Sequence, residues 1–246
     1  MTDLALAVRQ IRYENRAFWR NPPAAFFTFA FPLVFMVVFN VLFGEGAARF
    51  FTPAIIVFGV VTATFTNIAM TVAIARDDGV LKRMRGTPLP PWAYLAGRVG
   101  HAVLVALLLV AIVAVAGWLV YGVEIPWGEL PVIVLVLAVA AATLSAWGLA
   151  VSGLVPNADA APAMVNAIVL PVLFVSNVFF QMDQAPEWLD TASRVQPIRH
   201  FADAMLALYG IGGAGGVPWL ELGVMAAWGV AGVLAALRFF SWEPRR

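Results

Sequence analysis

The charged and titratable side chains of this sequence are few, and a third of the basic ones lie in one short stretch. The segment from Arg76 to Arg98 carries five of the fifteen basic residues and is interrupted by three closely spaced prolines. The two histidines, His101 and His200, are far apart, no cysteine is present, and no HExxH, GxSxG or phosphate-binding loop motif occurs. We therefore expect no catalytic residue and no metal site. The charged segment is instead suited to ionic contacts with another molecule.

The composition sets the environment in which that segment must be held. Hydrophobic residues make up 62% of the 246 residues and charged residues only 12%, whereas soluble domains are about half apolar and a quarter charged. The apolar runs are continuous and about twenty residues long, as membrane-spanning helices require. Barrel strands would alternate apolar and polar residues instead. The sequence predicts an all-α integral membrane protein that forms one transmembrane domain over residues 1–246.

Six membrane-spanning helices are predicted from the apolar runs. They cover residues 24–43, 51–75, 99–120, 131–154, 162–180 and 218–239. Ser145, Gly148 and Ser152 are small enough to let the fourth span pack closely against its neighbours. Residues 181–216 are too polar to cross the bilayer, and short helices are expected to begin near Pro186 and at Pro197.

Residues 1–23 are predicted to form an amphipathic helix in the membrane interface. At about 100° per residue, one side of this helix is basic and carries Arg9, Arg12, Arg16 and Arg20. Another side is apolar and carries Leu4, Ala7, Val8, Ile11 and Phe18. This pattern is typical of a helix whose arginines contact anionic head groups. The alternative is that these arginines only fix the topology.

The distribution of basic residues predicts the orientation. Six spans place both ends of the chain on one side, where twelve basic residues lie in the N-terminal helix, segment 76–98 and the C-terminal end. The other side carries only Arg49, Arg194 and Arg199. Because basic loops remain in the cytoplasm, both termini are expected there.

Polar residues within or beside the spans are candidates for a substrate path. They are Thr62, Thr66, Asn67, Thr71, Asn166 and Asn177. Polar side chains inside a span usually face protein or a cavity rather than lipid, so hydrogen bonding between helices is the alternative. A second set of candidates lies in segment 181–216 and comprises Asp183, Glu187, Arg199 and Asp203. These side chains either contact substrate or are solvated and paired, as the spacing of Arg199 and Asp203 allows.

Two stretches resemble the membrane subunit of type 2 ATP-binding-cassette exporters. Residues 76–89, RDDGVLKRMRGTPL, are similar to that family's acidic-Gly-x-Leu-x-Arg-x-x-x-Thr-Pro-Leu run, with Asp77 and Asp78 where the family usually has Glu. Residues 170–180, followed by APEWL at 185–189 and by Gln196-Pro197, are similar to its Leu-Pro-rich span, Phe-Phe end and Pro-x-Trp-Leu turn. The family includes drug-resistance, polysaccharide, teichoic-acid and nodulation-factor exporters.

The resemblance implies a transport subunit without catalytic activity of its own. Two copies, most simply a homodimer, would form a path through the bacterial cytoplasmic membrane. Two separate ATPase subunits would bind ATP and Mg and hydrolyse the ATP, so this chain would bind no cofactor and no nucleic acid. The substrate would be a hydrophobic or amphipathic drug, a lipid-linked molecule or a glycan. Segment 181–216 would form re-entrant helices over the outer end of the path.

The same resemblance implies that segment 76–98 is the cytoplasmic coupling element. Its expected coupling residues are Asp77, Asp78, Gly79, Leu81, Lys82, Arg83, Arg85, Thr87 and Pro88. Exposed charges would contact the ATPase, and the apolar side of the helix with Leu81 would complete the fit. The alternative is a charged loop that only sets topology.

Two other functions are weighed against ATP-driven export. An ion-coupled secondary exporter needs ionisable groups near the middle of the membrane, and none of the predicted spans carries Asp, Glu, Lys or Arg deep within it. A membrane-embedded enzyme needs clustered acids, histidines or an activated nucleophile. His101 and His200 are predicted on opposite sides of the membrane, which disfavours a shared site.

Overall fold

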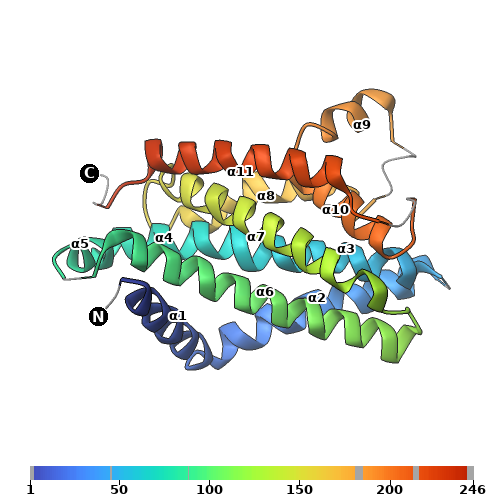
Figure 1. Cartoon of the computed structure of the whole chain (residues 1–246), viewed down its shortest axis with the longest axis horizontal. Coiled ribbons are helices and arrows are strands. Elements are labelled where there is room, and N and C mark those ends of the chain that lie inside the picture. The colour runs from blue at the N-terminus through green and yellow to red at the C-terminus, as the bar shows by residue number, and fades with distance from the viewer. Residues whose placement is uncertain (1–2, 45, 88, 181–184, 213–215, 243–246) are drawn as a thin grey trace.

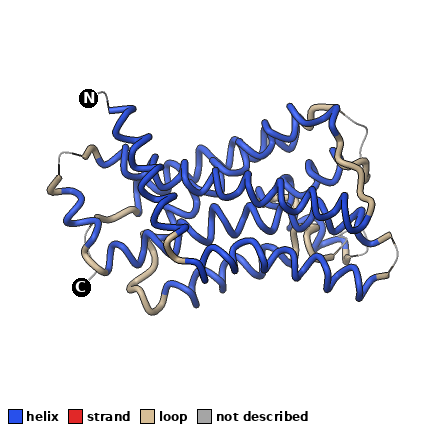
Figure 2. Tube along the Cα trace, turned by 90° about the horizontal axis from the view of Figure 1, so that it is seen from below, coloured by secondary structure: helices blue, strands red, loops and turns tan. Residues whose placement is uncertain are grey.

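The protein is a bundle of helices that lie roughly along one long axis (Figure 1, Figure 2). The computed structural model describes residues 3–44, 46–87, 89–180, 185–212 and 216–242, and every regular element among them is helical. The elements are α1 (Asp3–Trp19), α2 (Pro22–Phe43), α3 (Ala47–Val61), η1 (Thr62–Thr66), α4 (Asn67–Asp77), α5 (Val80–Arg85), α6 (Pro91–Tyr121), η2 (Trp127–Glu129), α7 (Leu130–Ser152), α8 (Ala161–Phe174), α9 (Glu187–Ser193), α10 (Pro197–Leu208) and α11 (Trp219–Phe239).

Five helical stretches among the described residues are long and apolar enough to cross a membrane. They are α2, the continuous run from α3 to α4, α6, the run from η2 through α7, and α11. This confirms an all-α integral membrane protein that crosses the bilayer several times. The run from α3 to α4 is the most buried of the five and forms the centre of the bundle.

The expected fifth span is shorter than predicted. Its helix, α8, has 14 residues and ends at Phe174, and residues 175–180 form turns. Asn177 has a left-handed backbone with φ of 60°, which a continuing helix does not allow. The Gln196 side chain donates to the carbonyl oxygens of Val172 and Val175. It therefore satisfies carbonyl groups that the end of the helix leaves free.

The central run contains one turn of π-helix, η1, where α3 meets α4. Gly148 of α7 packs against this turn, because a Cβ at Gly148 would lie only 2.8 Å from the Phe65 carbonyl oxygen. Ser145 and Ser152 of α7 are also buried. The prediction of close packing along the fourth span is therefore confirmed, and it brings α7 against the backbone of the central helix.

The N-terminal helix α1 packs on α6 through two glycines. A Cβ at Gly97 would overlap the Gln10 side chain, and a Cβ at Gly100 would lie 2.6 Å from Cδ1 of Ile11. Arg9, Arg12 and Arg16 of α1 and Arg20 just after it are exposed, as predicted. Val8, on the predicted apolar side, is 59% exposed, which leaves it open to the acyl boundary. Ile11 of the same side packs against Gly100, and Gln10 packs against Gly97.

The two ends of the bundle differ in charge. One end, which we call the basic end, is formed by α1, α5 and the last turns of α11 (Figure 1), and Arg12, Lys82, Arg83 and Arg238 are exposed there. The opposite end carries the α2–α3 turn, η2 and α9. The chain reversals and short helices at these two ends hold most of the candidate functional residues.

Candidate coupling face and substrate path

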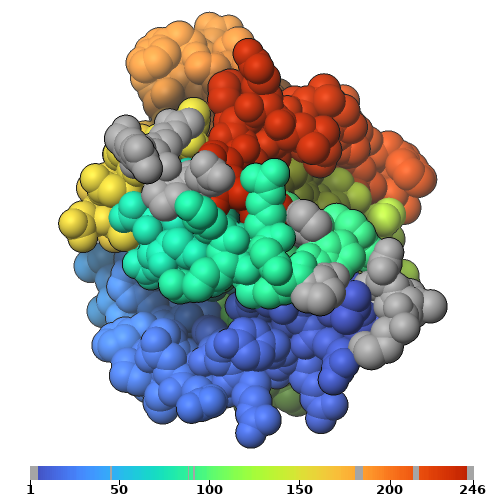
Figure 3. Space-filling view, turned by 90° about the vertical axis from the view of Figure 1, so that its left-hand side faces the viewer, coloured from blue at the N-terminus to red at the C-terminus, as the bar shows by residue number. Residues whose placement is uncertain are grey.

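The short helix α5 presents a charged surface at the centre of the basic end (Figure 3). Gly79 begins it with a left-handed backbone, φ of 69°, which reverses the chain after α4 at little steric cost. The predicted coupling residues that are exposed here are Asp78, Lys82, Arg83, Arg85 and Thr87. This part of the segment is accessible to a partner. Pro88 lies outside the described residues.

Leu81 faces the opposite way from these charges. Its side chain is fully buried among Val72, Tyr94 and Ala102, in a cluster shared by α4 and α6. The expectation that Leu81 contributes an apolar surface to a partner is therefore wrong. The Leu81 side of α5 packs inside the bundle instead, and its burial fixes α5 on α4 and α6.

Two charged residues at the end of α4 hold the turn between α7 and α8. Arg76 is 2% exposed, and its guanidinium donates to the carbonyl oxygens of Ser152, at 2.8 Å, and of Val155. The Asp77 carboxylate accepts from the Ala158 amide at 2.8 Å. Asp77 was expected on the exposed face, but it is half-buried in this contact. The end of α4, which precedes α5, is therefore bonded directly to the α7–α8 turn.

The predicted path residues are not gathered in one place. The Thr62 and Thr71 hydroxyls donate to the carbonyls of Phe58 and Asn67 in their own helix, so they do not link helices as the alternative supposed. Thr66 is half-buried and Asn166 is exposed on α8. The side chain of Asn177 donates to Asp203. Asn67 and Thr71 line a common cavity near the basic end.

The charged residues of segment 181–216 form a structural cluster. Arg199 is 7% exposed and donates to Asp203 at 2.7 Å, with Asp190 3.4 Å away on α9. This confirms the expected Arg199–Asp203 pair and favours an anchoring role over substrate contact. Glu187 is exposed on α9. Asp183 lies outside the described residues.

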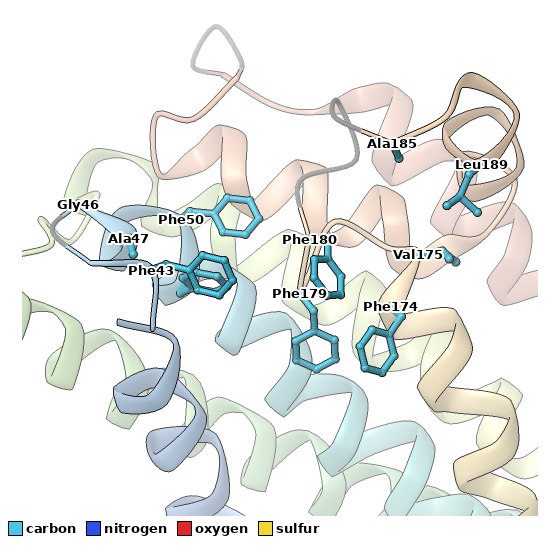
Figure 4. A pocket seen from close by; sticks show the side chains of 11 residues that line it. Phe43, Gly46, Ala47, Phe50, Phe174, Val175, Phe179, Phe180, Ala185 and Leu189 are labelled. Atoms are coloured by element: carbon cyan, nitrogen blue, oxygen red, sulfur yellow. The ribbon is translucent and has the colours of Figure 1, made fainter. Parts of the chain in front are cut away.

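A large aromatic cavity opens at the opposite end of the bundle (Figure 4). Its volume is about 690 Å³. Phe43 and Phe50 line it from α2 and α3, and Phe174, Phe179 and Phe180 line it from the end of α8 and the turns that follow. Residues that titrate are absent from its described lining. The cavity is therefore suited to an apolar or aromatic molecule.

A stripe of phenylalanines on α2 leads to this cavity. Phe31, Phe35, Phe39 and Phe43 follow one another every four residues, with successive ring centroids 4.8, 5.5 and 6.2 Å apart. Phe179 contacts the same stripe, 5.7 Å from Phe39. These phenylalanines are not among the predicted path residues, which are all polar. The i, i+4 spacing of phenylalanine within residues 24–43 was the signal available.

Comparison with known proteins identifies the family. The sequence profile of ABC-2 type transporters matches residues 6–209. The chain belongs to the ABC-2 type transporter family. One similar protein is the "Probable multidrug ABC transporter permease YbhR" of Escherichia coli K12, which is 26% identical over 161 residues. Another is the "Daunorubicin resistance ABC transporter permease protein DrrB1" of Streptomyces coeruleorubidus, 32% identical over 184 residues.

These matches cover only part of each relative. The alignment with the E. coli protein takes in 65% of this chain and 43% of that protein. The alignment with the Streptomyces protein takes in 70% of this chain and 64% of that protein. Membership of the ABC-2 family agrees with the resemblance found in residues 76–89 and 170–197.

Proposed function

We propose that this chain is the membrane-spanning permease subunit of an ATP-driven exporter. A separate ATPase subunit binds ATP and Mg, hydrolyses the ATP and docks on α5. Two copies of the chain pair as a homodimer in the bacterial inner membrane, with both termini in the cytoplasm. The ABC-2 family and the permease names of the two relatives support this proposal.

The observation that carries the proposal is that α5 is exposed on one side and packed against the bundle on the other. Its charged side is open to a partner, while Leu81 fixes the other side to α4 and α6. Arg76 and Asp77 join the end of α4 to the α7–α8 connection. A displacement of α5 by an ATPase is thereby transmitted to α4, α6, α7 and α8, which changes the relative stability of two arrangements of the bundle.

The aromatic cavity favours one of the three expected substrate classes. A hydrophobic or amphipathic drug-like molecule fits a cavity lined by phenylalanine rings better than a glycan, which needs many polar partners. The phenylalanine stripe on α2 supplies a continuous apolar surface towards this cavity. Drug-like molecules are therefore the proposed substrate class, in preference to lipid-linked molecules and glycans.

Mutation of Arg83 tests the coupling role. Because Arg83 is exposed, Arg83→Ala should leave folding intact while weakening association with the ATPase about fivefold, as for loss of one charged interface contact of roughly 1 kcal/mol. The measurement is the amount of ATPase that co-purifies from native membranes, together with the rate of drug export. Arg238→Ala, another exposed arginine at the basic end, is the matched control.

Purification of the chain from native membranes also tests the proposal. A chain that purifies alone from native membranes, intact and without an ATPase, would refute it. Export that survives ATP depletion and stops when the proton gradient collapses would support the ion-coupled alternative.

A further inference from the structure

A second cavity, of about 370 Å³, lies near the basic end between α1, α2, α4 and α6. Its lining combines charged, polar and apolar groups, unlike the aromatic cavity. The charged and polar part includes Glu14, Arg98, His101 and Asn67, and the apolar part includes Phe18 and Met70. A site of this size and mixed lining can hold a small amphipathic ligand.

His101 brings to the lining of this cavity a polar atom that has no partner in the described part of the chain. This side chain is 8% exposed, yet its Nδ1 atom has no hydrogen-bond partner among the residues that the structure describes. Phe18 contacts the same ring, with centroids 5.4 Å apart. A buried polar atom without a partner is costly, and a ligand that bonds to it removes this cost.

Charges of both signs face the cavity. Nε of Arg98 lies 3.6 Å from Oε1 of Glu14, and each side chain is 16% exposed. The same Glu14 oxygen accepts from Gln10, and the same Arg98 nitrogen donates to the Tyr94 hydroxyl. These bonds leave the second carboxylate oxygen of Glu14 and the terminal nitrogens of Arg98 to bind a ligand that carries both charges.

The cavity lies beside the interfacial helix α1 and the start of α2, where membrane lipids are the neighbouring molecules. Arg12 and Arg16 are exposed on α1 and Arg20 just after it, which is how an interfacial helix meets lipid head groups. The lining residues Asn21 and Ala24 at the start of α2 are exposed, so the cavity opens where the chain enters the membrane. The ligand that meets these conditions has a phosphate, an ammonium group and an apolar body.

We propose that this cavity binds the zwitterionic head group of a phosphatidylethanolamine-type lipid from the adjoining leaflet. Arg98, Asn67 and the Nδ1–H form of His101 hold the phosphate, and Glu14 holds the ammonium group. Phe18 and Met70 contact the glycerol and the first methylenes. The lipid is a resident ligand that joins α1 to α2, α4 and α6, and its binding does not depend on the transport function proposed above.

Native mass spectrometry of the full chain in mild detergent tests this proposal. The probes are palmitoyl-oleoyl phosphatidylethanolamine and phosphatidylglycerol, added singly and in competition. We expect one tightly held phosphatidylethanolamine and about tenfold weaker binding in Asn67→Ala, as for loss of one hydrogen bond to a charged group. Asn166→Ala, on the exposed side of α8, should bind like the wild type.

A second variant tests the ammonium contact separately. Glu14→Gln keeps the size and hydrogen-bonding oxygen of the side chain but removes its charge, so the preference for phosphatidylethanolamine over phosphatidylglycerol should disappear. Equal affinity of the wild type for the two lipids would overturn the proposal, as would unchanged binding in Asn67→Ala. Equally tight binding of free phosphoethanolamine would also overturn it, because the ligand would then be a soluble metabolite.

Discussion

Arg76 is the residue whose role changes most between sequence and structure. As one of five basic residues in segment 76–98, it was expected to belong to a solvated charged stretch. In the bundle it is buried and donates to carbonyl groups at the end of α7. A guanidinium group suits this position because it has five donors and remains charged when buried.

Replacement of Arg76 should destabilise the protein. Arg76→Ala removes two charge-assisted hydrogen bonds and leaves the carbonyls of Ser152 and Val155 without their partner. We expect a loss of about 2–3 kcal/mol, seen as a fall of roughly 5 °C or more in the melting temperature measured by tryptophan fluorescence in detergent. Arg85→Ala, at an exposed position, is the control. An unchanged melting temperature in Arg76→Ala would contradict the contact.

Some residue roles followed from the sequence and others did not. The exposure of Lys82 and Arg83 and the pairing of Arg199 with Asp203 were predicted, because both depend on neighbours a few positions away. The burial of Arg76 and Leu81 was not, because their partners come from α6 and α7. Local spacing carries no information about such distant contacts.

At the scale of elements, the N-terminal helix α1 packs more closely against the bundle than its amphipathic pattern indicated. The sequence predicted a helix lying in the interface, and its exposed arginines agree with that. The two glycines of α6 add a close contact with α1, which places one wall of the lipid cavity. The spacing of Gly97 and Gly100 can be read from the sequence. The sequence does not indicate that α1 is the helix that packs against these two glycines.

Substitution at Gly97 should loosen this contact. The added methyl group of Gly97→Ala would overlap the Gln10 side chain and lie 3.3 Å from the Gln10 carbonyl carbon, so α1 must shift. We expect faster amide exchange throughout α1 and a lower melting temperature. Gly223→Ala in α11 meets no atom within 4 Å, and it should be neutral or stabilising by up to about 1 kcal/mol through helix propensity. Equal behaviour of the two variants would argue against the packing described here.

At the scale of the whole molecule, the two cavities lie at the two ends of α2. The cavity near the basic end is lined by Ala24 and Thr28, and the aromatic cavity by Phe43. Hydropathy alone placed the five helical stretches that, among the described residues, are long enough to cross a membrane, but it made the predicted span at 162–180 longer than the helix α8 found there. It could not predict which faces of these spans meet, because every face of such a helix is apolar, and the cavities depend on that arrangement.

On the proposed function, the aromatic cavity sets the affinity for the exported molecule. Phe43→Ala removes one ring from its lining and should raise the apparent KM for a planar aromatic drug about fivefold, corresponding to roughly 1 kcal/mol of ring contact. Phe27→Ala is the control, because Phe27 is similarly exposed on α2, at 63% against 56% for Phe43, but is outside the cavity lining. Drug efflux from membrane vesicles supplies the measurement. Equal KM values for the two variants would exclude Phe43 from the path.

The early end of α8 has a consequence for the bilayer itself. Its 14 residues extend about 21 Å, whereas the hydrocarbon core is about 30 Å thick. The turns of residues 175–180 follow this helix, so α8 alone is shorter than the hydrocarbon core. A short helix is accommodated by local thinning of the bilayer. We therefore expect a local hydrophobic mismatch beside α8, next to the aromatic cavity that Phe174 lines.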